Sequence, residues 1–248
     1  MTLIWIVLAS LLGGVLSVLL AALIASPWLE RWLAPAVSYA VGTLLGAAFL
    51  GLIPEAHAAG LEVEMLSALL LGGILLFFML ERAALWRHDH DTHDAHPHPA
   101  GLLIVAGDAL HNFVDGILIA AAFLADTHLG IITTLAIVTH EIPQEIGDFM
   151  ILIQAGYTRS RALMLNLAAS LASLVGAVGG YLLLSQLQAI VPYVLALSAA
   201  SFIYIAVADL VPQLHRHYRR DQPILQFALL FLGIALIGLQ QLSLHHAH

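Results

Sequence analysis

Residues 101–125 read GLLIVAGDALHNFVDGILIAAAFLA, and this stretch decides the fold. A helix needs about 20 apolar residues to cross the hydrocarbon core of a bilayer, so the stretch predicts a transmembrane helix. Four polar side chains interrupt it at spacings of i, i+3, i+4 and i+7, which place them on one helical face. They belong to Asp108, His111, Asn112 and Asp115.

The rest of the chain is similarly apolar. Of its 248 residues, 61% are hydrophobic and 10% are charged, a composition that excludes a water-soluble domain. In lipid only helices and closed barrels satisfy their backbone hydrogen bonds, and these stretches are too long for the strands of a barrel. We predict one all-α integral membrane domain, residues 1–248, with eight transmembrane helices, the other seven at about 3–25, 36–57, 63–86, 129–155, 160–184, 191–212 and 223–244.

Basic residues give this predicted bundle an orientation. The chain has no Lys, and its Arg residues fall only at the connections that follow the first, third, fifth and seventh helices. Because connections rich in Arg stay in the cytoplasm, we expect these four to be cytoplasmic and both termini to be extracytoplasmic. The residues are Arg31, Arg82, Arg87, Arg159, Arg161, Arg216, Arg219 and Arg220.

A second polar face lies on the stretch 129–155, where Pro143 also removes one backbone donor and favours a kink. The two faces together carry five carboxylates, which at about 2.5 to 3.5 kcal/mol each would cost roughly 12 to 17 kcal/mol in lipid. A bound divalent cation offsets such a cost, and protonated acids that hydrogen-bond between helices are the alternative. We predict that the two faces form one polar site near the bilayer midplane. The face on 129–155 consists of His140, Glu141, Gln144, Glu145 and Asp148.

Two short segments resemble each other across the chain. Leu52-Ile53-Pro54-Glu55-Ala56-His57 ends the second helix, and Leu210-Val211-Pro212-Gln213-Leu214-His215 ends the seventh. With the Arg-based orientation the segments lie at opposite membrane faces, as an inverted repeat of helices one to three onto six to eight requires. We predict a 3+2+3 inverted-repeat bundle with the fourth and fifth helices on its axis, and a chance match is the alternative.

The connection after the third helix is rich in metal-binding side chains. Residues 88–98, within a polar loop at about 87–100, hold five His and three Asp. This composition is typical of a metal-binding tract, here on the cytoplasmic side, and a disordered solvated loop is the alternative. The chain has no Cys, which excludes disulfides and thiolate ligands, so a metal must be held by nitrogen and oxygen. Nucleic acid is excluded as a partner because no basic surface is present.

The two polar faces carry a family resemblance. His-Asn-x-x-Asp-Gly at 111–116, preceded by Gly107-Asp108, and His-Glu-x-Pro-x-Glu at 140–145, followed by Gly147-Asp148, resemble the paired motifs of the ZIP (Zrt/Irt-like) metal transporters. They are most similar to the subgroup whose second motif reads His-Glu-x-Pro-His-Glu. The His-rich loop and the eight-helix plan are similar as well, so the resemblance covers nearly the whole chain.

ZIP proteins hold a metal centre at mid-membrane, often binuclear, and the resemblance implies which residues bind it here. The implied metal ligands are His111, Asn112, Asp115, His140, Glu141 and Gln144. Asn112 and Glu141 would contribute to a neighbouring second site and the other four would form the main one. Gln144 departs from the usual His or Glu and is a weaker, neutral ligand, and Gly51 stands where many members have His. Asp108, Glu145 and Asp148 would orient ligands or relay protons.

These observations predict a divalent metal ion transporter that mediates uptake toward the cytoplasm. It is not an enzyme and has no catalytic residues and no prosthetic group. Its cargo is Zn²⁺, with Fe²⁺, Mn²⁺ and Cd²⁺ as further candidates. An intramembrane metal-dependent hydrolase is one alternative, but its His-Glu-x-x-His motif requires a His where Gln144 stands. A metal sensor without flux is the other.

The sequence also suggests where the protein lies and what it contacts. We expect a multi-pass protein of the cell membrane, surrounded by lipid, and a prokaryotic inner membrane because the chain is short and lacks a large external domain. Gly42-x-x-x-Gly46 and Gly176-x-x-x-Gly180 are typical of close helix packing. Such packing serves either a homodimer or the inside of one chain.

Overall fold

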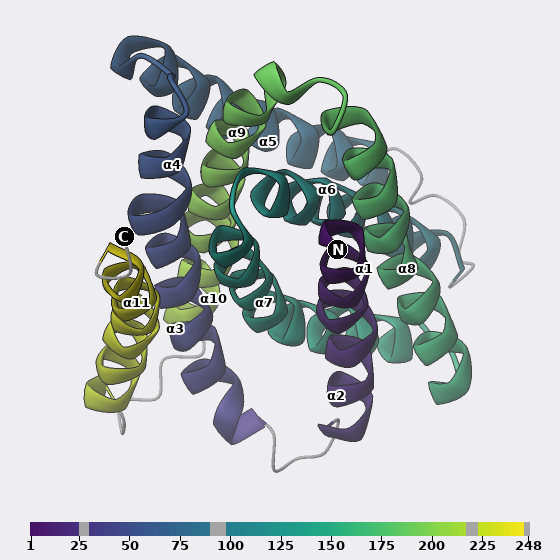
Figure 1. Cartoon of the computed structure of the whole chain (residues 1–248). Coiled ribbons are helices and arrows are strands. Elements are labelled where there is room, and N and C mark those ends of the chain that lie inside the picture. The colour runs from purple at the N-terminus through teal and green to yellow at the C-terminus, as the bar shows by residue number, and fades with distance from the viewer. Residues whose placement is uncertain (25–29, 90–97, 217–222, 246–248) are drawn as a thin grey trace.

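The computed structural model describes residues 1–24, 30–89, 98–216 and 223–245, which form eight helical rods (Figure 1). A rod is a run of helical segments without a break, and three of the rods include a π-helical segment, labelled η1, η2 or η4. A 3-10 turn, η3 (Gln188–Ile190), precedes the seventh rod. The rods are α1, η1 and α2 (Thr2–Leu11, Leu12–Leu16, Ser17–Ile24); α3, η2 and α4 (Glu30–Gly46, Ala47–Leu52, Ile53–Ala58); α5 (Val63–Asp89); α6 (His98–Ala125); α7 (Thr127–Gln154); α8 (Arg159–Leu184); α9, η4 and α10 (Val191–Tyr204, Ile205–Leu210, Val211–Arg216); and α11 (Pro223–His245).

The eight rods confirm the predicted all-α fold, and no strand occurs in the described residues. Six rods contain a stretch that is long and apolar enough to cross a membrane. The other two are α7, which carries the polar face at 140–148, and α11, whose apolar stretch is Pro223–Leu239. The positions of the termini relative to the membrane stay a prediction.

The two helices with the polar faces run through the middle of the bundle (Figure 1). α6 packs most extensively against α8, and α7 contacts α2, α3, α6 and α8. α11 lies against α3, and α5 lies against α9. The central position of α6 follows from its second half, a row of small and apolar side chains that are all buried: Leu118, Ile119, Ala120, Ala121 and Ala122.

The second and seventh rods share one backbone irregularity. η2 ends at Leu52 and η4 ends at Leu210, and each leads into a short α-helix whose second residue is proline. Proline cannot donate to the carbonyl four residues earlier, and the wider π-helical turn precedes it in both rods. α4 packs on α9 and α10 packs on α3, so the rods run antiparallel (Figure 1). This is the arrangement that the predicted inverted repeat requires.

Both glycine motifs pack helices within the chain. A Cβ atom at Gly176 would overlap the backbone of Phe113 on α6, and one at Gly42 would overlap the backbone of Leu230 on α11. Small residues allow helix backbones to approach this closely in membranes. The second glycines of the motifs, Gly46 and Gly180, also face Ile237 of α11 and Ile117 of α6. The motifs therefore do not argue for a homodimer.

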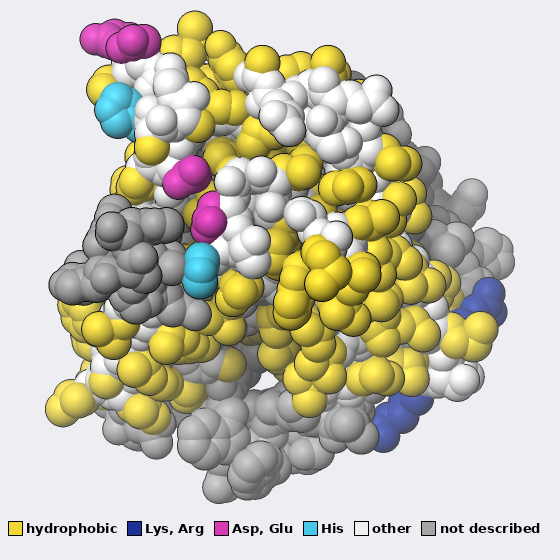
Figure 2. Space-filling model, in the orientation of Figure 1, with side chains coloured by type: hydrophobic (Ala, Val, Ile, Leu, Met, Phe, Trp, Pro, Cys, Tyr) yellow, Lys and Arg dark blue, Asp and Glu magenta, His cyan; other side chains and the backbone are white. Residues whose placement is uncertain are grey.

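Charged side chains are distributed unevenly between the two ends of the bundle. On the face drawn in Figure 2, Arg side chains lie toward one end, and acidic and His side chains gather toward the other. Arg82 of α5 and Arg159 and Arg161 of α8 are exposed, and we call their end of the bundle the Arg end. The start of α6 and the end of α7 belong to it. Residues 90–97 of the His-rich loop lie outside the described residues.

Candidate metal centre

A tight turn sets the two polar faces against each other. Asp126 is the only residue between α6 and α7, and its Oδ1 accepts hydrogen bonds from the backbone N–H groups of His128 (2.8 Å) and Leu129 (3.0 Å). A side chain that caps the first N–H groups of a helix fixes where the helix begins. The short link makes α6 and α7 antiparallel neighbours, so residues equally far from the turn lie at the same depth.

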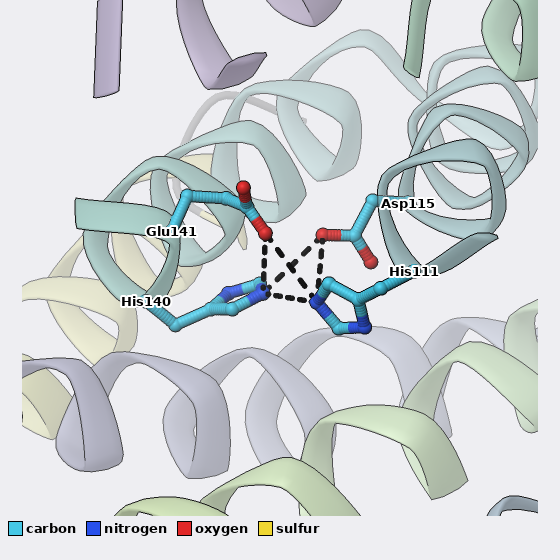
Figure 3. A group of neighbouring side chains, drawn as sticks. All are labelled: His111, Asp115, His140 and Glu141. Carbon is cyan, nitrogen blue, oxygen red and sulfur yellow. Dashed lines mark hydrogen bonds and ion pairs between the residues drawn. The ribbon is translucent and has the colours of Figure 1, made fainter. Parts of the chain in front are cut away.

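Four side chains from these helices converge on one point (Figure 3). The Nε2 atoms of His111 and His140 are 3.3 Å apart. Nε2 of His140 lies 3.3 Å from Asp115 Oδ2 and 3.5 Å from Glu141 Oε1. Nε2 of His111 lies 3.4 Å from the same Glu141 oxygen and 3.8 Å from the same Asp115 oxygen.

These separations fit a single metal ion. Zn²⁺ binds N and O ligands at about 2.0 to 2.2 Å, and a tetrahedral arrangement then separates the ligand atoms by about 3.3 to 3.6 Å. All four ligand atoms lie within 4.8 Å of one another. Two carboxylates balance the charge of one divalent ion, so the group is complementary to such an ion in number, chemistry and charge.

The ring of His140 is already turned to bind. Its Nδ1 lies 3.0 Å from the carbonyl oxygen of Ala136, one turn earlier on α7. When Nδ1–H donates to that carbonyl, the proton resides on Nδ1, and the Nε2 lone pair faces Asp115 and Glu141. A backbone partner of this kind orients many metal-binding His residues. The ring also packs edge-on against buried Phe202 of α9, with ring centroids 6.2 Å apart.

Asp115 and Glu141 are buried, and the only donors beside their oxygens among the described residues are the two imidazoles. Nε2 of each imidazole lies 3.3 to 3.8 Å from one oxygen of each carboxylate, and a neutral imidazole with its proton on Nδ1 donates no hydrogen bond there. A buried charged group without a hydrogen bond is costly. A cation between the two carboxylates would offset that cost, which is the strongest structural argument for a metal here.

A second group of acids adjoins the first. Oxygens of Asp108, Glu141 and Glu145 lie within 4.8 Å of one another, and all three residues are buried. Glu141 belongs to both groups. The carboxamide of Asn112 points at this second group, because its Nδ2 donates to Oδ1 of Asp108 at 2.9 Å and to the Asp108 carbonyl at 3.2 Å.

The centre is closed on the side away from the Arg end. There, buried apolar side chains fill the space between α6 and α7 and their neighbours, namely Leu118, Ile119, Phe123, Leu129, Ile132 and Ile137. On the other side the polar face continues through Asp108 and Glu145 to half-buried Asp148. Among the four converging side chains, His111 alone is partly exposed, at 23%. The side of the centre toward the Arg end is therefore lined by polar side chains and the opposite side by apolar ones.

Comparison with known proteins identifies the family. A family model described as ZIP Zinc transporter matches residues 87–241, more than half of the chain. The chain belongs to the ZIP zinc transporter family. The match includes both α6 and α7, so the two motifs that resembled this family lie within the part of the chain that establishes membership.

Curated relatives of this ZIP family member are animal zinc transporters. It is 33% identical over 219 residues to zinc transporter ZIP13 of Pongo abelii, an overlap that covers 82% of this chain and 65% of the relative. It is 34% identical over 150 residues to the ZIP13 homolog of Drosophila melanogaster, with coverage of 59% and 42%. It is 39% identical over 132 residues to ZIP4 of Rattus norvegicus, with coverage of 53% and 20%. The chain thus spans less than two thirds of these relatives, and the animal relatives do not support the expected prokaryotic membrane.

The structure brings most of the predicted ligands of this ZIP family member together. His111, Asp115, His140 and Glu141 form one group. Asn112 is buried beside Asp108, and Gln144 is half-buried one turn after His140. The family resemblance implied that Glu141 contributes to a second site, whereas its Oε1 lies 3.4 Å from Nε2 of His111 and 3.5 Å from Nε2 of His140. Asp108 and Glu145 were predicted on the two faces of one polar site, and they come together because they lie nearly equally far from the turn at Asp126.

Proposed function

We propose that this ZIP family member transports divalent metal ions, with Zn²⁺ as the preferred ion. The observation that carries the proposal is the convergence of two imidazoles and two buried carboxylates at ligand spacing inside a helical bundle. Imidazole suits Zn²⁺ better than harder ions such as Mg²⁺ and Ca²⁺, and the absence of thiolates disfavours Cu(I). Fe²⁺, Mn²⁺ and Cd²⁺ are further candidate cargo.

The ligand set follows from this proposal. His111, Asp115, His140 and Glu141 hold the ion, and their spacing supports all four in that role. Gln144 completes the coordination when the ion moves, since it is one turn from His140 on the same helix. Asn112 contributes through its neighbour Asp108. Residues 1–248 act as a single transmembrane domain.

The apolar lining on one side of the centre and the polar lining on the other support uptake toward the Arg end. The excess of Arg makes this end cytoplasmic. The ion then enters from outside when the apolar side chains on the side away from the Arg end move apart, and it leaves past Asp108, Glu145 and Asp148. The His-rich loop at about 87–100 receives the ion there. A site of N and O ligands desolvates an ion and still releases it, which a transport site must do.

Several finer assignments accompany the proposal. Both termini are extracytoplasmic, the surrounding medium is a lipid bilayer, and a second copy of the chain is a further partner, although the glycine motifs pack within the chain. A prokaryotic inner membrane gains no support from the animal relatives and is not part of the proposal. Neither the hydrolase nor the sensor alternative gains support from any distance or partner described above.

Uptake of radioactive Zn²⁺ into proteoliposomes tests the proposal. We expect His111→Ala and His140→Ala to abolish uptake, because each removes one of four converging ligands. His128→Ala is the matched control, since that side chain is exposed near the turn between α6 and α7. Uptake at native rates by both site variants would show the ligand assignment to be wrong. Binding without uptake by the native chain would favour the sensor.

A further inference from the structure

We propose that Thr43 of α3 and Thr139 of α7 are positioning residues for His140. Their Oγ1 atoms are 2.7 Å apart and share a hydrogen bond. This bond couples the packing of α3 against α7 to the strength with which His140 binds an ion. The inference rests on the proposed function, because it takes His140 to be a metal ligand. Neither threonine belongs to the group of converging ligands or to the two motifs that resemble the ZIP family.

The carbonyl group of Ala136 is the point where the threonines reach His140. Nδ1 of His140 lies 3.0 Å from this carbonyl oxygen, and Oγ1 of Thr139 lies 2.9 Å from it. In an α-helix the same oxygen accepts the backbone N–H four residues later, so one of its two lone pairs remains. The imidazole N–H and the Thr139 hydroxyl therefore compete for one position. His140 is held firmly in its metal-binding tautomer only when Thr139 donates elsewhere.

A count of hydrogens shows where Thr139 donates. Two hydroxyl oxygens 2.7 Å apart need a hydrogen between them, and each hydroxyl has one hydrogen to give. In one arrangement Thr43 donates to the carbonyl of Ala40, at 2.9 Å, and Thr139 donates to Thr43. The imidazole N–H of His140 then has the Ala136 carbonyl to itself, so each of the three hydrogens has its own acceptor. The reverse arrangement places two hydrogens on the last lone pair of Ala136, so the first one is favoured.

The acceptor that Thr43 offers depends on how α3 packs. Thr43 is 0% exposed, and its helix is held closely by α11, because a Cβ atom at Gly233 would lie 2.8 Å from the backbone nitrogen of Thr43. The seventh rod contacts His140 as well, through the ring of Phe202. If α3 moves away from α7, Thr139 loses its acceptor and its hydrogen returns to the Ala136 carbonyl. The affinity for an ion is therefore highest while α3 and α7 are packed together, and it falls when they separate.

Calorimetric titration of the purified full-length chain with Zn²⁺ in lipid nanodiscs tests the inference. Thr43→Val removes the acceptor and keeps nearly the same shape, so we expect the dissociation constant to rise by about tenfold or more. Thr43→Ser keeps the hydroxyl and should bind Zn²⁺ as the native chain does. Thr134→Val is the matched control, since Thr134 also donates to a backbone carbonyl of α7, that of Gly130, at 2.7 Å. It should leave the dissociation constant unchanged.

A double substitution separates positioning from packing. Thr139→Val removes the hydroxyl that competes for the Ala136 carbonyl, so on its own it should leave Zn²⁺ binding close to that of the native chain. Added to Thr43→Val, it should restore the affinity that Thr43→Val loses, because no competing hydrogen remains. A loss caused by disturbed packing between α3 and α7 would not be reversed by a second substitution in the same contact. Thr43→Ala is a second probe with the same expected loss and the same rescue, and it replaces Thr43→Val if that variant does not fold.

Two results would overturn the inference. One is Zn²⁺ binding by Thr43→Val that is as tight as that of the native chain. The other is a double variant that binds as weakly as Thr43→Val alone. Either result leaves the proposed function intact, because that depends on Zn²⁺ uptake by His111→Ala and His140→Ala. Uptake at native rates by those two variants would instead refute the ligand assignment itself.

Discussion

Replacement of Glu141 by Gln should stabilise the metal-free protein and remove most of the stabilisation that Zn²⁺ gives to the native chain. In the metal-free chain this carboxylate is buried, its Oε1 has only the two imidazoles as neighbouring donors, at 3.4 and 3.5 Å, and it has three other buried carboxylates as neighbours in the two groups that share it. Glu141→Gln removes one negative charge and adds an amide that donates to those neighbours. The side chain keeps nearly the same shape, so little packing is lost.

The expected magnitude follows from that environment. An unsatisfied buried polar group costs about 1 to 3 kcal/mol, so the metal-free variant should be more stable than the native chain by about that amount. For a chain of this size about 1 kcal/mol corresponds to about 2 to 4 °C in melting temperature. Zn²⁺ at 100 times its dissociation constant stabilises the native chain by about 2.7 kcal/mol. Glu141→Gln should lose nearly all of that gain because it removes a ligand.

Thermal unfolding in detergent, followed by tryptophan fluorescence with and without Zn²⁺, measures both effects. Glu62→Gln is the control, since Glu62 is exposed and lies outside the helices, and it should match the native chain under both conditions. If the metal-free Glu141→Gln variant melts below the native chain and still gains stability from Zn²⁺, Glu141 is not a ligand of the metal ion.

Three other perturbations address the packing, the open ligand position and the protonation of the site. Gly176→Ala should destabilise the chain by about 1 to 3 kcal/mol, because the new Cβ atom would overlap the α6 backbone. Gly179→Ala is the control and should not destabilise it, since a Cβ atom there meets open space. Equal melting temperatures of the two variants would contradict the close α6–α8 contact. Gln144→His should tighten Zn²⁺ binding by about tenfold or more, and an unchanged dissociation constant in calorimetry would remove Gln144 from the ligand set. Zn²⁺ binding should weaken as the pH falls, because His and carboxylate ligands bind metal only when deprotonated. A binding constant that does not change with pH argues against these side chains as ligands.

Helix positions could be predicted well because lipid imposes a simple rule on the sequence. The predicted helices at about 101–125 and 160–184 match α6 (His98–Ala125) and α8 (Arg159–Leu184) to within a few residues. The π-helical segments η2 and η4 could not be predicted, because their wider turns depend on how the second and seventh rods pack and not on composition. The repeated Leu-x-Pro segments were the only sign of them in the sequence.

The site was predictable along each helix and less so between helices. Spacing alone placed His111 with Asp115, and His140 with Gln144, on single faces. Which oxygen meets which nitrogen depends on the rotation and depth of two packed helices, and this brought Glu141 into the His-containing group. The turn of the Asn112 carboxamide toward Asp108 likewise depends on one side-chain torsion, which no sequence pattern specifies.

The unequal exposure of the four ligands has a kinetic consequence. Asp115, His140 and Glu141 are buried, and His111 is partly exposed. Water can reach a bound ion first on the side of His111, so this ring is the first ligand that a departing ion can exchange for water. Release is then a stepwise process in which ligand exchange begins at His111 and the three buried ligands follow.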